Sequence, residues 1–190
     1  SFRIEDEYNI MNDKLYSNIF DTIHDNICIV GEPGIGKSWL VQNMINNIFK
    51  PNNVKYVRYT FFRNIQDFSI KDRVNKNVMI SNIKKQLINY YGYDKMSNLY
   101  GSSLQEILDF LEKNNEKITF IFDGLDHIDR EFSIHSSELS KEVIEVKNEI
   151  ISISKKNCNV IIVSQPIEEI DTYLNCGFKK IEMSWSIHVP

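Results

Sequence analysis

The stretch that most constrains this chain is residues 31–38, GEPGIGKS. It has a glycine, four free positions and then Gly-Lys-Ser, the spacing of a phosphate-binding loop, or P-loop. The apolar run before it, residues 26–30, predicts a buried strand, and residues 39–49 after it carry apolar side chains at helical spacing. In a strand, glycine turn and helix, backbone N–H groups converge on an anion. Because both flanks are present, we interpret the loop as a phosphate site rather than a chance turn before a helix.

The residues of this loop are candidate ligands of a nucleotide: Gly31, Glu32, Pro33, Gly34, Ile35, Gly36, Lys37 and Ser38. The glycines permit backbone angles and a close approach to phosphate that a Cβ would obstruct. We expect Lys37 to reach the β- and γ-phosphates and the Ser38 hydroxyl to ligate Mg²⁺. The expected cofactors are therefore ATP or ADP with Mg²⁺, with GTP as an alternative nucleotide.

A second group of polar residues follows the apolar run of residues 118–122, which predicts another buried strand. Strands of a parallel sheet end beside the phosphate loop, so we expect Asp123 to hold Mg²⁺; the alternative is a turn residue at the strand end. Asp126 follows a turn at Gly124. It either polarises an attacking water or caps the turn, and the residues alone leave both roles open.

A third strand is predicted at residues 159–163, and Ser164-Gln165-Pro166 follows it. Gln165 at this strand end is a candidate to orient the γ-phosphate or its attacking water. The alternative is that it only ends the strand before a proline.

Strands and helical stripes alternate along the whole chain, which predicts an α/β fold. We expect a three-layer P-loop NTPase core, with a parallel sheet of about five strands and helices on both faces. Residues 1–25 are expected to form a helix leading into the core, and residues 26–190 the core itself. Further helices are expected around residues 80–91, 104–111, 139–153 and 167–174, and further strands at 54–59 and 178–183. The first residue is not Met, so we expect a piece of a longer protein.

The amino-acid composition limits the kinds of partner that we expect for this chain. The net charge of −4 indicates no general attraction to nucleic acid, and no apolar run approaches the length of a membrane span. Cys28, Cys158 and Cys176 lack metal-ligand spacing, which indicates structural thiols in a reducing, cytoplasmic compartment.

Three segments together resemble the STAND class of NTPases, and within it the NACHT-type group of AAA+-related (ASCE) P-loop proteins. They are GEPGIGKS, ITFIFDGLDH and NVIIVSQP. The resemblance implies phosphate contacts by Lys37 and Ser38, a Mg²⁺-associated acid at Asp123 and a catalytic acid at Asp126. Gln165 falls where relatives commonly carry Arg, which departs from the family pattern.

The resemblance also implies a nucleotide-controlled switch that self-associates and releases an effector, often in defence or cell-death signalling. Since the family's helical lid is expected after this chain, we expect the chain alone to bind nucleotide, hydrolyse it slowly and stay monomeric. Two other classes remain open. One is a nucleotide-gated scaffold that does not hydrolyse, and the other is a small-molecule or nucleotide kinase with the segment from Arg58 to Arg73 as its basic lid.

Overall fold

The computed structural model describes residues 24–61, 73–128 and 139–183. The strands are β1 (Ile27–Gly31), β2 (Lys55–Thr60), β3 (Ile118–Asp123), β4 (Asn159–Ser164) and β5 (Lys179–Met183). The α-helices are α2 (Lys37–Met44), α3 (Lys76–Tyr91), α4 (Tyr93–Met96), α5 (Leu104–Lys113), α7 (Leu139–Ser154) and α8 (Glu169–Asn175). A helix was expected in residues 1–25, of which residues 1–23 lie outside the described part.

The described strands form one five-stranded sheet in the order β2-β3-β4-β1-β5. All four pairings are parallel. β1, β3 and β4 are buried along their whole length, as expected for strands covered on both faces. The predicted parallel α/β architecture is therefore confirmed.

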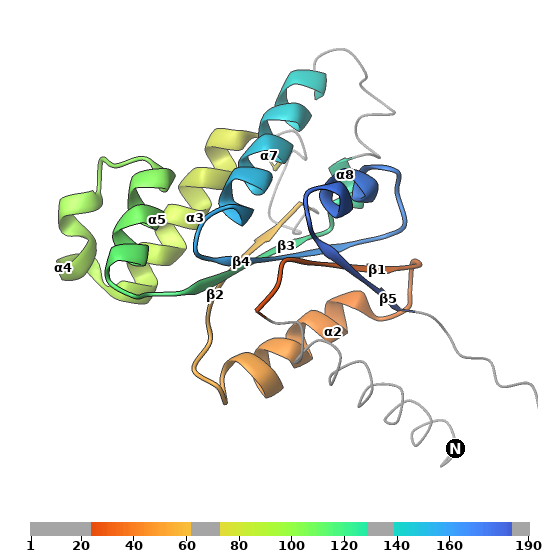
Figure 1. Cartoon of the computed structure of the whole chain (residues 1–190), viewed down its shortest axis with the longest axis horizontal. Helices are drawn as coiled ribbons and strands as arrows, with labels where there is room; N and C mark the ends of the chain where they lie inside the picture. The colour runs from red at the N-terminus through yellow and green to blue at the C-terminus, as the bar shows by residue number, and fades with distance from the viewer. Residues whose placement is uncertain (1–23, 62–72, 129–138, 184–190) are drawn as a thin grey trace, which may run out of the picture.

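The sheet separates two helical layers (Figure 1). α2 covers one face, and its Leu40, Val41 and Met44 pack with Ile29 and Ile121 of the sheet. On the other face lie α3, α5, α7 and α8, whose apolar residues pack against the alternate positions of the same strands. This alternation follows from the two-residue period of a strand, so each strand residue can be assigned to the α2 face or to the opposite face.

Local signals place the helix ends. Ser103 caps α5 by accepting a hydrogen bond from the Glu106 backbone N–H, and the Glu106 carboxylate accepts one from the Ser103 N–H in return. α3 starts three to four residues earlier than its apolar stripe, because Asn75 accepts hydrogen bonds from the N–H groups of Asn77 and Val78.

The helix after the phosphate loop differs from expectation in its second half. α2 continues as a π-helix, η1 (Ile45–Phe49), instead of a regular α-helix to residue 49. A short 3₁₀ turn, η3 (Ser97–Leu99), also follows α4. Neither irregularity is predicted by the apolar spacing: η1 still buries Ile45, Ile48 and Phe49, and η3 buries no residue.

None of the described helices is long and apolar enough to cross a membrane. The three thiols are free, and burial raises the pKa of Cys28 and Cys158 to about 12. Both therefore stay protonated at neutral pH and behave as small apolar side chains.

Candidate nucleotide-binding site

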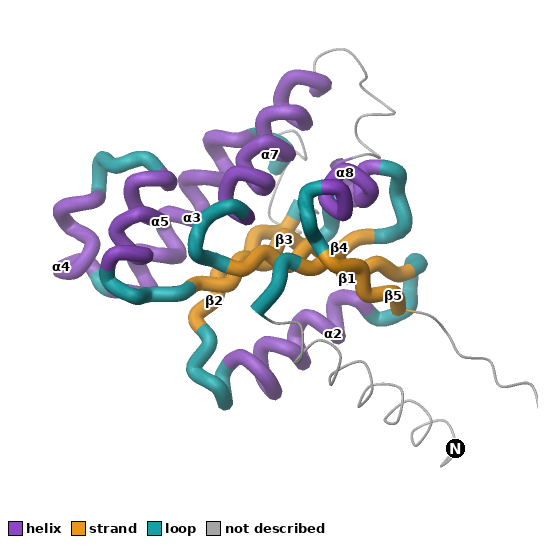
Figure 2. The backbone as a smooth tube through the Cα atoms, viewed as in Figure 1, coloured by secondary structure: helices purple, strands orange, loops and turns teal. Residues whose placement is uncertain are grey.

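The phosphate loop joins the carboxyl end of β1 to the first turn of α2 (Figure 2). Gly36 precedes the helix with φ 97°, a left-handed conformation that favours glycine. A Cβ on Gly31 would stand 2.8 Å from Ile35 Cγ2 and 3.1 Å from Met183 Cβ, so this position is also restricted to glycine. Ile35 is buried, whereas Glu32, Pro33 and Gly34 are exposed. The loop is thus anchored by one apolar side chain and open to solvent at its tip.

Lys37 turns back over the loop. Its Nζ donates to the carbonyl oxygens of Gly31 at 2.6 Å and Glu32 at 2.9 Å. The ammonium group is therefore held against the backbone of the loop itself. Ser38 is exposed in the first turn of α2.

Asp123 ends β3 two strands away from the phosphate loop. The register aligns Asp123 with Val163 of β4 and Val163 with Ile29 of β1. Since neighbouring strands lie about 4.8 Å apart, Asp123 is about 10 Å from β1 across the sheet. It also occupies the same face as Ile121, which is the α2 face. This separation leaves room for a metal ion between the phosphate loop and Asp123.

The Asp123 carboxylate is buried and held by an arginine. Only 3% of the residue is exposed, and Nη2 of Arg58 on β2 lies 2.5 Å from Oδ2. Burial raises the pKa of Asp123, because the charged form loses its hydration, and the hydrogen bond from Arg58 acts in the opposite direction.

Asp126 lies in the turn that follows β3 and is also 3% exposed. This turn folds back onto β4, because the N–H groups of Gly124 and Leu125 both donate to the carbonyl oxygen of Val163. Asp126 Oδ1 accepts a hydrogen bond from the Gln165 N–H at 3.0 Å. Its Oδ2 is buried without a hydrogen bond in the described residues, with His127 Nε2 at 3.9 Å. One oxygen thus fixes the loop, and the other accepts no hydrogen bond from the described residues.

Ser164 ends β4 and Gln165 follows it, between the phosphate loop and Asp123 across the sheet. Ser164 is fully buried, and its hydroxyl donates to the carbonyl of Gln165 at 2.8 Å. Its hydroxyl is therefore committed to the backbone. Gln165 is partly exposed at the same strand end. The structure brings the predicted residues Asp123, Asp126 and Gln165 together at one edge of the sheet, adjacent to the loop.

The residues present fit a magnesium ion bound together with a nucleotide. The described residues contain no group of three or more His, Cys, Asp or Glu placed to hold a metal by themselves. Mg²⁺ in nucleotide sites is held by few protein oxygens, with phosphates and waters completing its shell. The exposed Ser38 hydroxyl and the buried Asp123 carboxylate supply oxygen atoms of this kind.

Arg58 is the residue of this site that sequence reasoning did not assign. The sequence places it only in a possible basic lid, but it lies inside β2 and pairs with Asp123. A signal was present: Arg58 follows Tyr56 at the two-residue spacing of a strand, and Tyr56 packs on the α2-face core. A charged residue at such a position requires a counter-ion. Which acid supplies it depends on the strand order, which spacing does not show.

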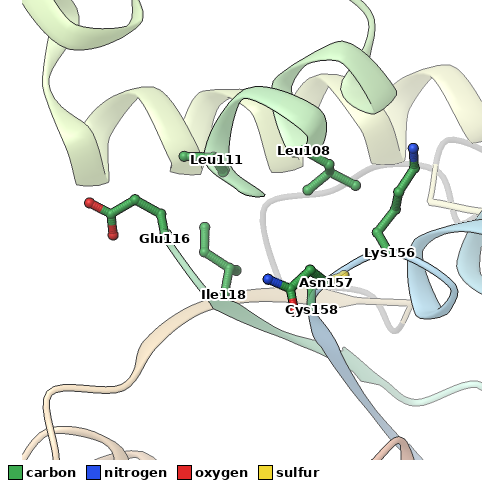
Figure 3. Close-up of a pocket in the computed structure, with 7 residues that line it drawn as sticks. All are labelled: Leu108, Leu111, Glu116, Ile118, Lys156, Asn157 and Cys158. Atoms are coloured by element: carbon green, nitrogen blue, oxygen red, sulfur yellow. The ribbon is translucent and has the colours of Figure 1, made fainter. Parts of the chain in front are cut away.

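A small hollow elsewhere in the fold is distinct from this site. It is lined by residues at the amino ends of β3 and β4 and on α5 (Figure 3), including Leu108, Ile118 and Cys158. The phosphate loop lies at the carboxyl ends of the strands, so the hollow is at the opposite edge of the sheet.

A parallel sheet in which β4 separates the phosphate-loop strand from the strand of Asp123 defines an AAA+-related P-loop NTPase core. The NACHT domain family model matches residues 25–171, and the chain belongs to the NACHT family. It is a nucleotide-binding NTPase domain, and the predicted family is confirmed.

One solved structure supports the fold. The ORC2 protein of Aeropyrum pernix, solved in ADPNP-ADP complexes, is similar over 90% of this chain, with 16% identity and a TM-score of 0.55. This chain spans 46% of the length of that protein. A DnaB-like replicative helicase, whose structure was described with its interactions with primase, has 9% identity and a TM-score of 0.31 over 78% of this chain and 40% of its own. No curated protein matches the sequence.

Proposed function

We propose that this domain is the ATP-dependent switch of a STAND-type signalling NTPase. In this proposal the bound nucleotide controls self-association of a longer cytoplasmic protein that acts in defence or cell-death signalling. Membership of the NACHT family supports the nucleotide switch, and the ADPNP-ADP complexes of the ORC2 protein support ATP and ADP as ligands. The observation that carries the proposal is the buried Asp123 at a strand end on the same face of the sheet as the phosphate-loop helix.

The residues have distinct proposed roles. Lys37 leaves the carbonyls of Gly31 and Glu32 to pair with the β- and γ-phosphates, while backbone N–H groups of the loop bind phosphate oxygens. Ser38 and Asp123 hold Mg²⁺, which neutralises charge on the phosphates when it is bound. Asp126 Oδ2 orients the attacking water, and Gln165 lies beside the γ-phosphate.

One observation favours the scaffold that binds nucleotide without hydrolysis. Asp126 already accepts a hydrogen bond from the Gln165 N–H, so it has a structural role even if it performs no catalysis. No comparable observation among the described residues favours a kinase: Arg58 of the expected basic lid lies in β2 and pairs with Asp123, and residues 62–72 of that segment lie outside the described part.

Replacing Asp123 tests the metal site. Asp123→Asn is expected to lower the Mg²⁺-dependent part of the ATP affinity about tenfold, because the amide supplies no negative charge to the metal's shell. Calorimetric titrations with Mg²⁺ and with EDTA measure this part directly. Asp109→Asn on α5, whose carboxylate pairs with Lys156 at 2.7 Å, is the matched control. An unchanged Mg²⁺ dependence in Asp123→Asn excludes the metal role.

The switch itself is tested by phosphate release and light scattering on the same sample. We expect a monomer that binds nucleotide and turns over more slowly than about one per second, since hydrolysis at such sites often needs an arginine beside the γ-phosphate. Gln165 supplies no charge at its strand end. A monomer that turns over several times faster than this rate contradicts the proposal.

A further inference from the structure

The ion pair between Arg58 and Asp123 lies inside the proposed metal site. The exposed fraction of the side chain is 25% for Arg58 and 4% for Asp123, and their contact is 2.5 Å between Nη2 and Oδ2. Both residues are on the α2 face of the sheet, the face that carries the phosphate-loop helix. A buried carboxylate needs a counter-charge, and Arg58 supplies one before any metal arrives.

Arg58 is fixed from its other side. β2 is an end strand of the described sheet, and Gln86 of α3 lies along its outer edge. The Arg58 N–H donates to Gln86 Oε1 at 3.1 Å, and Gln86 Nε2 donates to the Arg58 carbonyl at 2.8 Å. The Gln86 amide thus takes the place of a neighbouring strand. The Arg58 backbone is held, and only its side chain is free to respond to a change at Asp123.

The guanidinium is costly to keep in this position. Its Nε is buried without a hydrogen bond in the described residues. Arg58 therefore gives up hydration in order to pair with Asp123, and it gains no second partner for this nitrogen. A neutral side chain would pack in this place without that cost.

A magnesium ion and Arg58 would share one carboxylate. The two cations repel one another, and the attraction between Asp123 and a metal is reduced by the positive charge already beside it. We propose that Arg58 is a positioning residue that competes with Mg²⁺ for Asp123 and so lowers the affinity of the site for metal-bound nucleotide. This inference rests on the proposed metal role of Asp123.

The competition determines the sign of a mutational effect. Removing the Arg58 charge destabilises the nucleotide-free domain more than the Mg²⁺-bound one, because in the bound state the metal also balances Asp123. Mg²⁺ should therefore raise the ATP affinity of the variant by a larger factor than it raises that of the unaltered chain. A residue that only supports the fold, or only orients Asp123, has the opposite effect, since its loss weakens metal binding.

The test compares ATP affinity with Mg²⁺ and with EDTA, measured by calorimetry at pH 8. Arg58→Gln keeps an N–H donor for Asp123. In this variant, the ratio of the affinity with Mg²⁺ to the affinity with EDTA is expected to be about tenfold higher than in the unaltered chain. Arg58→Lys retains the charge and should keep the original ratio. Lys55→Gln removes a cation from the same strand, where Lys55 pairs with Glu116 away from the site, and should also leave the ratio unchanged. An equal or smaller ratio in Arg58→Gln overturns the proposal.

Asp123→Asn separates the two ideas. If the ratio of the two affinities falls in Asp123→Asn but does not rise in Arg58→Gln, the proposed competition between Arg58 and Mg²⁺ is wrong and the metal role of Asp123 stands. If the ratio in Asp123→Asn equals that of the unaltered chain, the metal role itself is wrong. In the double variant, Arg58→Gln with Asp123→Asn, the rise should disappear, because no carboxylate remains to be contested.

A measurement on the unaltered chain covers the case in which Arg58→Gln does not fold. Nitrogen-detected NMR of arginine side chains reports how freely each guanidinium rotates, and Arg58→Lys identifies the Arg58 signal. Rotation of the Arg58 guanidinium should be faster with ATP and Mg²⁺ than with ATP and EDTA, because the metal weakens its bond to Asp123. Equal or slower rotation with Mg²⁺ contradicts the proposal.

Discussion

Lys37→Ala is expected to lower the affinity for both ATP and ADP by about 10- to 100-fold, because one charge-assisted contact of this kind contributes about 1.5–3 kcal/mol. Lys37 already lies at the rim of the phosphate loop, with Nζ 2.6 Å from the carbonyl oxygen of Gly31. In the proposed complex, a rotation of this one side chain brings its charge to the phosphates. Calorimetric titration with each nucleotide measures the loss.

The matched control for this prediction is Lys50→Ala. Lys50 directly follows η1 at the far end of the same helical segment, and its Nζ contacts Asn46 Oδ1 at 3.1 Å. This variant removes an equal charge away from the phosphate loop and should bind nucleotide as the unaltered chain does. If Lys37→Ala also binds with unchanged affinity, the assignment of the phosphate loop is wrong.

Asp126→Asn is expected to spare nucleotide binding and to reduce phosphate release about 10²- to 10⁴-fold, the range for loss of a group that moves or orients a proton. The substitution keeps an oxygen that accepts the hydrogen bond from the Gln165 N–H, so the turn after β3 should stay folded. What it removes is the negative charge at the buried Oδ2, which has no hydrogen bond in the described residues.

Turnover of this domain is expected to be slow, so the Asp126 comparison is made with protein in excess of labelled ATP over hours. Asp126→Ala, which also removes the acceptor for Gln165, separates the structural part from the catalytic part by its lower melting temperature. If Asp126→Asn releases phosphate at the rate of the unaltered chain, Asp126 serves only to hold the turn, and the scaffold becomes the better proposal.

The elements of this fold that the sequence predicts are those marked by a pattern of neighbouring residues. The strand before Gly31 and the strand ending at Asp123 follow from short apolar runs, and the phosphate loop follows from its glycine pattern and its flanks. The start of α5 follows from Ser103 and Glu106, which form a capping box visible as a sequence pattern. These signals are local in the chain, which is why sequence alone contains them.

Long-range pairings were not predictable in the same way. The contact of Arg58 with Asp123 spans 65 positions, and that of Asp126 with Gln165 spans 39. Both depend on which strands are neighbours, and a parallel sheet of given strands can be assembled in several orders. From the sequence, the role of Asp126 stays open between orienting a water and capping a turn, because the residue that it contacts, Gln165, directly follows a different strand.

The predicted roles of Lys37, Ser38, Asp123, Asp126 and Gln165 remain proposals about chemistry, whereas their positions are set by the fold. Their common feature is placement at the carboxyl ends of β1, β3 and β4, where a ligand between the strand ends contacts all three. The central claim is therefore one of location: metal-bound nucleotide binds at this edge of the sheet.

Hydrogen–deuterium exchange with and without ATP and Mg²⁺ tests that claim most directly. We expect slower exchange of backbone amides in the phosphate loop (residues 31–38) and in residues 123–127 and 164–165. Exchange around the hollow lined by Leu108, Ile118 and Cys158 should not change. Protection at that hollow without protection of the loop, or no protection at saturating nucleotide, would contradict it.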